Sequence, residues 1–192
     1  ELRRISSQSG KWLPMKVIKT ELENCVIIEP IIHEDHRGVF VETFQTLKYA
    51  SEAGIKFPFV QDNYSRSFRG VLRGLHYQQT KPQGRLIRVV HGEVFDVAVD
   101  LRSESSTFRQ WSSIVLSGEN MKQVWIPPGF AHGFLVLSDI ADLEYKCSEY
   151  YSPEDERQIR WNDPELDIAW PIQNPILSLK DSKAPALSDC FI

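Results

Sequence analysis

The chain has 192 residues, with 22 Lys and Arg against 26 Asp and Glu, and 42% of its residues are hydrophobic. This composition is typical of a single globular domain and excludes disordered, collagen-like and coiled-coil chains. The net charge of −4 argues against a protein that coats nucleic acid or a membrane surface, since such proteins carry a basic excess.

Features of the chain also bear on its location. No apolar run reaches the roughly 18 residues that a membrane-spanning helix needs. Three cysteines without C-x-x-C spacing favour reduced thiols in the cytoplasm and argue against structural zinc. The polar residues 1–14 resemble a vector-derived, non-native leader before a start at Met15, so we expect one functional domain over residues 15–192.

Short segments rich in β-branched and aromatic residues predict strands along most of the chain. In chain order these segments are 17–20, 26–32, 40–44, 86–90, 94–101, 112–116, 123–126 and 134–137. Alternation is clearest over 94–101, which has apolar side chains on one face and Asp96, Ala98 and Asp100 on the other.

Turns and short helices are predicted between the strands. Residues 35–38 and the pair His91-Gly92 indicate hairpin turns, and only 46–53 has helical spacing. Residues 152–156 could open one helical turn, and 162–192 is expected to be loop with short helical pieces. Many short strands separated by Gly and Pro turns predict one all-β domain, a sandwich or barrel.

A Pro-Gly turn followed by a histidine is the first specific motif. Residues 127–132 follow a predicted strand and resemble the second motif of the cupin superfamily, a jelly-roll barrel of two antiparallel sheets. In metal-binding cupins an upstream H-x-H supplies further ligands, but here that segment contains His76 and Gln78. Two histidines and an amide make a poor divalent metal site, so we expect no metal.

A strand histidine preceded by two Arg-Gly units is the second motif. A neutral His76 is a competent general base if a carboxylate orients its other nitrogen, although most strand histidines are structural. Together with residues 59–67, 92–102, 127–134 and 145–153, the segment 69–78 resembles the dTDP-4-dehydrorhamnose 3,5-epimerase family. The resemblance runs from about residue 15 to 185.

This resemblance implies a cofactor-independent isomerase that inverts C3 and C5 of a dTDP-linked 4-keto-6-deoxyhexose in dTDP-L-rhamnose biosynthesis. Both carbons lie α to the C4 carbonyl, so either deprotonation gives an enolate with its charge on O4. By the resemblance His76 is the base, Asp181 its carboxylate partner and Tyr145 the acid on the opposite face. Arg85 stands where the family typically has lysine, and we expect it to stabilise the enolate.

The resemblance also implies a set of substrate contacts. Arginine and lysine side chains suit the diphosphate, polar side chains the sugar and base, and an aromatic ring the thymine face. The implied contacts are Arg37, Phe40, Glu42, Gln61, Asn63, Arg73, His132, Tyr151, Glu156 and Lys180.

Several alternatives stay open at this point. A relative could epimerise only one carbon or move the ketone between C3 and C4, and a non-catalytic cupin could bind the same nucleotide sugar as a sensor. A metal-dependent cupin oxygenase is a further interpretation. Gln78 argues against it, because an amide replaces the second histidine of the H-x-H pattern. The resemblance further implies a cytoplasmic homodimer whose N-terminal strands are exchanged, serving cell-surface polysaccharide such as O-antigen, with no nucleic-acid or membrane partner.

Overall fold

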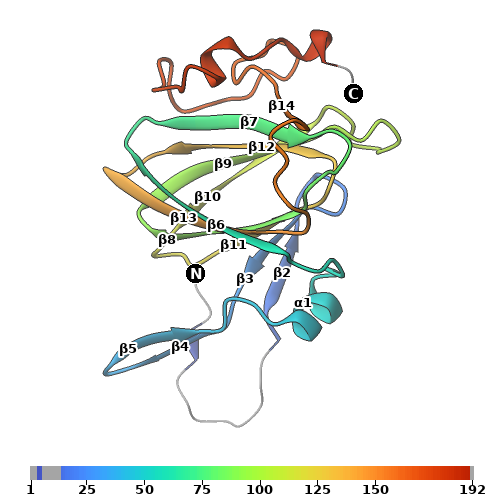
Figure 1. Ribbon diagram of the computed structural model, residues 1–192. Coiled ribbons are helices and arrows are strands. Elements are labelled where there is room, and N and C mark those ends of the chain that lie inside the picture. The colour runs from blue at the N-terminus through green and yellow to red at the C-terminus, as the bar shows by residue number, and fades with distance from the viewer. Residues whose placement is uncertain (1–3, 6–13, 191–192) are drawn as a thin grey trace.

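Two antiparallel sheets that face each other form the body of the protein (Figure 1). The computed structural model describes residues 4–5 and 14–190. The five-stranded sheet consists of β10 (Trp111–Ser117), β9 (Glu93–Asp100), β12 (Phe130–Val136), β7 (Leu72–Gln78) and β14 (Glu156–Gln158), in that spatial order. The six-stranded sheet consists of β2 (Lys16–Lys19), β3 (Val26–Glu29), β11 (Gln123–Ile126), β8 (Arg85–His91), β13 (Ile140–Cys147) and β6 (Gln61–Phe68).

The remaining elements lie outside these two sheets. A small third sheet has the order β1 (Arg4–Ile5), β4 (Ile32–Asp35) and β5 (Gly38–Val41), and it extends away from the barrel (Figure 1). The helix α1 (Thr46–Glu52) and two 3-10 turns, η1 (Asp181–Lys183) and η2 (Leu187–Asp189), complete the described chain. None of its helices is long and apolar enough to cross a membrane.

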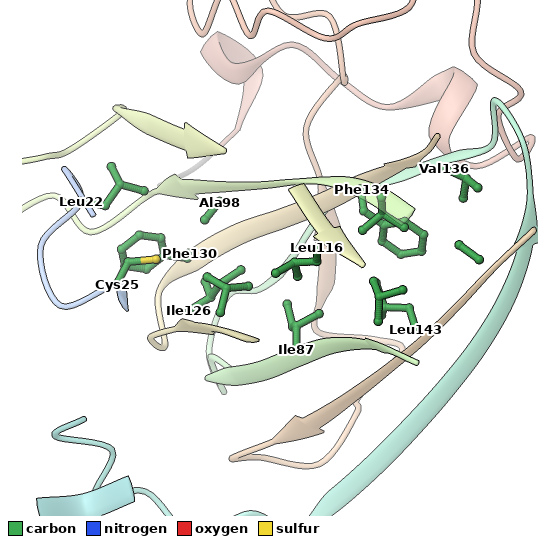
Figure 2. Packing of buried hydrophobic residues seen from close by; sticks show 14 residues of the cluster. Leu22, Cys25, Ile87, Ala98, Leu116, Ile126, Phe130, Phe134, Val136 and Leu143 are labelled. Carbon is green, nitrogen blue, oxygen red and sulfur yellow. The ribbon is translucent and has the colours of Figure 1, made fainter. Parts of the chain in front are cut away.

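The core is divided into three layers by the two sheets. Figure 2 shows the cluster between the sheets, in which Ile87 and Leu143 face Phe134 and Leu116. A second cluster joins the outer face of the five-stranded sheet to the C-terminal segment, which lies over β7 in Figure 1. A third packs α1 against the outer face of the six-stranded sheet. Because the C-terminal segment belongs to the core, its residues are held firmly beside β7.

The structure confirms the predicted all-β jelly-roll architecture with a few short helices. Residues 123–126 form β11 as predicted, 35–38 join β4 to β5 in a hairpin, and the helix over 46–53 is present as α1. The predicted strand over 26–32 is interrupted at Pro30, which divides it into β3 and β4.

Other expectations were wrong in detail. The chain passes between the two sheets at His91-Gly92, so β8 and β9 are not a hairpin, although Gly92 has the expected positive φ of 77°. Residues 152–156 form a turn and the start of β14 and contain no helix. Most of the expected leader, residues 1–14, falls outside the described residues and stays a prediction; Arg4–Ile5 pair in parallel with β4.

Three long strands were missing from the predicted set. The strand β6 carries polar side chains on both faces, and β7 contains Gly74, so neither has a simple apolar alternation. In β13 apolar side chains from Ala141 to Cys147 do alternate with polar ones, and the prediction missed this pattern. The alternation of β9 was predicted correctly, but both of its faces are buried: Val94 and Ala98 lie between the sheets, and Val97 and Val99 lie under the C-terminal segment. Asp96 therefore points into the barrel.

Candidate active site

One end of the barrel contains a cavity of about 570 Å³ between the two sheets. Strands from both sheets and the C-terminal segment line it, which brings together residues distant in the sequence. Eleven of the fourteen predicted site residues are in its wall: Gln61, Asn63, Arg73, His76, Arg85, His132, Tyr145, Tyr151, Glu156, Lys180 and Asp181.

Two histidines face each other across neighbouring strands of the cavity wall. His76 on β7 is the register partner of His132 on β12, next to an irregularity in the pairing. The strands approach closely there because Gly74 has no side chain: a Cβ at this residue would lie 2.5 Å from the Cα of Gly133. The two glycines thus allow both imidazoles to enter the same end of the barrel.

The C-terminal segment supplies a carboxylate to His76. Asp181 Oδ1 lies 2.5 Å from His76 Nε2, and the Ser178 hydroxyl donates to Asp181 Oδ2 over 2.8 Å. Burial raises the pKa of Asp181, but the hydrogen bonds from His76 and Ser178, together with the charge of His76, outweigh burial and hold it below its usual value. An ionised Asp181 accepts a hydrogen bond from the N–H at His76 Nε2. His76 Nδ1 therefore keeps a lone pair and can act as a base.

Tyr145 enters the cavity from β13 in the opposite sheet. Burial raises the pKa of its phenol, and the positive charge of Arg85 opposes this shift without cancelling it. Tyr145 is therefore a neutral proton donor at physiological pH. A base and an acid on opposing sheets suit a reaction that removes a proton from one face of a carbon and adds one to the other.

Arg85 lies between the two histidines. Its Nη1 is 3.4 Å from His132 Nδ1 and 3.5 Å from the carbonyl oxygen of His76, and its Nη2 donates to Gln83 over 3.3 Å. His132 Nε2 lies 2.8 Å from the buried Asp96. Because a guanidinium only donates, His132 Nδ1 must accept and its Nε2 carries the proton toward Asp96. The guanidinium charge is thereby fixed beside the cavity.

Polar side chains from β6 and β7 form one wall. Gln61 donates to Asn63 over 3.0 Å and accepts from the backbone of Tyr151 over 2.9 Å. Arg73 Nε donates to Ser67 over 3.0 Å, which leaves part of its guanidinium available to the cavity. The ring of Tyr151 is half exposed at the cavity edge.

Glu156 links three of the predicted residues. Its Oε2 accepts from the Tyr151 hydroxyl over 2.9 Å and contacts Lys180 Nζ, while its Oε1 lies 4.0 Å from His76 Nδ1. Burial raises the pKa of Glu156, but the hydrogen bonds from Lys180 and Tyr151 outweigh it and keep that pKa below its usual value. His76 thus stands between two carboxylates.

The other three predicted residues lie outside the cavity of this chain. Arg37 is exposed in the turn between β4 and β5 and pairs with Asp35 at 2.6 Å. The Phe40 ring on β5 is 71% exposed, and Glu42 pairs with Lys48 at 3.1 Å. The chain alone therefore does not bring them to His76.

Gln78 has a structural role that its cupin position did not suggest. Its amide donates to the carbonyls of Lys81 and Tyr150, over 2.7 and 3.2 Å, and accepts from the backbone of Ser152 over 2.9 Å. These bonds hold the loop that carries Tyr151. Among the residues that the structure describes, no cluster of three or more His, Cys, Asp or Glu side chains could hold a metal ion.

Sequence reasoning missed three supporting residues. Asp96 holds His132, Ser178 holds Asp181, and Gln83 contacts Arg85. Only Asp96 had a usable signal, since it is a carboxylate that shares the inward face of β9 with Val94 and Ala98. Ser178 and Gln83 lie in segments without periodicity.

The fold is a cupin-type jelly roll, and its cavity brings together a candidate acid and a candidate base. The model of the family "dTDP-4-dehydrorhamnose 3,5-epimerase" matches residues 19–189. The chain belongs to this family. An enzyme of that name from Shigella flexneri is 54% identical over 168 residues, covering 87% of this chain and 93% of the relative.

Solved structures show the same fold. The dTDP-6-deoxy-D-glucose-3,5-epimerase of Legionella pneumophila, in complex with dTDP-4-keto-L-rhamnose, is 54% identical with a TM-score of 0.88, covering 91% of this chain and 93% of that one. A 3′-monoepimerase from Streptomyces bikiniensis, in complex with dTDP-quinovose, is 38% identical with a TM-score of 0.82, covering 88% and 86%.

Proposed function

We propose that this protein is a dTDP-4-dehydrorhamnose 3,5-epimerase, which inverts C3 and C5 of dTDP-4-dehydro-6-deoxy-D-glucose to give dTDP-4-dehydro-L-rhamnose. The observation that carries the proposal is the His76–Asp181 pair in one cavity with the neutral Tyr145 on the opposing sheet. The family membership and the 54% identity to the two 3,5-epimerases support the choice of substrate.

The proposed reaction proceeds through an enolate at each carbon. His76 Nδ1 takes the proton α to the C4 ketone, and the resulting charge on O4 faces the guanidinium of Arg85. Tyr145 then protonates the other face of the same carbon. Acid, base and a cation beside the oxyanion are sufficient for this chemistry, so the reaction needs no cofactor.

The cavity wall supports binding of a nucleoside diphosphate sugar. Arg73 and Lys180 supply positive charge for the diphosphate, and the exposed ring of Tyr151 at the edge can stack on the thymine. Gln61 and Asn63 offer amides to the base or sugar, and His132, which lies beside Arg85, is placed to contact the sugar. Glu156 joins Lys180 to Tyr151 at the same edge.

Incubation with dTDP-4-keto-6-deoxyglucose in deuterated water tests this function. We expect deuterium at both C3 and C5 and a product with the L-rhamno configuration, measured by NMR. Absence of deuterium would contradict an enzymatic role and would favour a nucleotide-sugar sensor.

A single-site epimerase is the second candidate, because the 3′-monoepimerase shares the fold at 38% identity. Deuterium at C3 alone would support that reading, and migration of the ketone from C4 to C3 would support a ketoisomerase. The higher identity to the two 3,5-epimerases, 54% against 38%, favours the double epimerase.

We also propose that the protein is a homodimer with exchanged N-terminal arms. Arg37, Phe40 and Glu42 lie on the extended segment around β4 and β5 and leave the cavity of their own chain without these contacts. A partner's arm would bring them to the substrate and would cover Phe40.

Three free cysteines and the nucleotide-sugar substrate support a cytoplasmic location and a role in rhamnose-containing polysaccharide synthesis.

A further inference from the structure

Two inversions on one substrate require the acid and base to be restored between them. After the first inversion His76 carries the proton taken from carbon, and Tyr145 has given its own proton away. A second abstraction requires neutral His76 and a second protonation requires neutral Tyr145. The site therefore needs a group that removes the proton from His76 while the substrate is bound.

The carboxylate of Asp181 cannot serve as that group. It bonds to His76 Nε2, whereas the proton from carbon arrives at Nδ1. Asp181 is also almost completely buried, with 3% of its side chain exposed. It is suited to fixing the ring, and a proton transferred to it would have no direct exit to solvent.

Glu156 has the required position. Its Oε1 lies 4.0 Å from His76 Nδ1, a gap that one bridging water or a shift of about 1 Å closes. Its Oε2 contacts Lys180 and the hydroxyl of Tyr151, whose side chains reach solvent, with 53% of the Lys180 side chain exposed. Glu156 thus connects the base nitrogen to the solvent edge of the cavity.

Lys180 connects this path to substrate binding. In the free protein its ammonium contacts Glu156 and helps to keep the pKa of that carboxyl low. A diphosphate that attracts Lys180 would remove this stabilisation of the Glu156 carboxylate. Glu156 would then be a better proton acceptor when substrate is present than when the cavity is empty.

We propose that Glu156 is a proton-transfer residue that restores His76 between the two inversions; this role rests on the proposed epimerase function. The Nδ1–H bond of His76 breaks, the proton forms an O–H bond with Glu156, and it leaves to water at the cavity edge. The phenolate of Tyr145 takes a proton from water. One proton leaves to solvent and one enters, so the charge of the site is restored.

The Glu156→Gln variant tests this role because it keeps an oxygen that can accept from Tyr151 but cannot take a proton. In deuterated water we expect the fraction of product labelled at only one carbon to rise at least about tenfold, with lower kcat and nearly unchanged KM. Formate should restore double labelling in Glu156→Ala, and chloride should not. The control is Glu144→Gln on β13, whose carboxylate pairs with Arg88 at 2.7 Å and does not line this cavity.

The possible results separate this role from others. If Glu156→Gln labels both carbons in the same ratio as the unmodified protein, the proposal is wrong. A parallel loss at both carbons with raised KM would show that Glu156 only holds substrate, and would also overturn it. If the unmodified protein incorporates no deuterium, the epimerase function itself fails.

Discussion

At the scale of single residues, the hydrogen bonds around His76 decide which of its nitrogens is basic. The Asp181 carboxylate accepts from Nε2, and Ser178 fixes that carboxylate from its other oxygen. Removing the negative charge would allow the imidazole to take the other tautomer, with its proton on Nδ1. The base would then face the substrate without a lone pair.

We therefore expect Asp181→Asn to lower kcat by about 10²- to 10⁴-fold with little change in KM, because the amide donates to Nε2 and reverses the tautomer. Steady-state kinetics and NMR of the imidazole nitrogens would measure the two effects. Asp189→Asn, an exposed aspartate on η2, is the matched control and should behave as the unmodified protein. Full activity in Asp181→Asn would show that the pair does not orient the base.

Arg85 provides a second test at this scale, since its charge lies beside His132 and the carbonyl of His76. We expect Arg85→Met to lower kcat by about 10²- to 10³-fold, through loss of the cation beside O4. Arg85→Lys should have a kcat within about tenfold of that of the unmodified protein. The positive charge remains in this variant, although the contact with Gln83 is lost. Equal kcat values for the Met and Lys variants would rule out a role for the charge.

At the scale of elements, the contact between β7 and β12 sets the spacing of the two histidines. Gly74 has φ of 141°, and a Cβ there would collide with the backbone of Gly133. The strands cannot separate freely, because β12 also pairs with β9 along its whole length. The register His132↔His76 therefore depends on both glycines.

Gly74→Ala should lower the free energy of unfolding by about 2–4 kcal/mol, measured by urea denaturation, and should disturb activity in the fraction that stays folded. Gly54→Ala is the control, because Gly54 also has positive φ, 73°, but nothing lies within 4 Å of its added Cβ. That variant should lose only about 1 kcal/mol from backbone strain. Similar losses in both variants would mean that strain, and not the strand contact, dominates.

The sequence predicted the elements with simple periodicity better than those that form the site. The strands β9 and β11 have clear apolar patterns, whereas β6 lines a polar cavity and has polar side chains on both faces. The alternation of β13 is present in the sequence but was missed. His76 and Tyr145 were identified through family motifs, since a strand histidine and a strand tyrosine are ordinary core residues. The approach of Asp181 to His76 depends on packing of the C-terminal segment, which local sequence does not encode.

At the scale of the whole molecule, the third sheet distinguishes an isolated chain from the proposed dimer. The side chains of Val39 and Phe40 on β5 are 51% and 71% exposed, which is a large apolar exposure for a two-residue segment. Arg37 at the hairpin tip is exposed and pairs with Asp35. This arm is therefore suited to contact with a second copy.

Mixing two inactive variants would test the exchange of arms. In a mixed dimer of His76→Asn with Arg37→Ala, one cavity carries both changes and the other carries neither. If subunits exchange, about a quarter of all sites should regain activity, because half of the dimers are mixed and each has one intact site. No recovery after verified subunit exchange would show that each arm serves its own chain.

The side-chain amide of Gln78, which donates two hydrogen bonds and accepts one, also limits how this barrel could change its chemistry. A histidine at that position would complete the H-x-H pattern with His76, but it would release the carbonyls of Lys81 and Tyr150 and the backbone amide of Ser152. The loop bearing Tyr151 would lose its anchor, and the Arg85 guanidinium beside His132 would still oppose a bound cation. Conversion to a metalloenzyme thus passes through a variant that is a poorer epimerase and does not yet bind a metal ion. This holds for mutation in nature and for design in the laboratory.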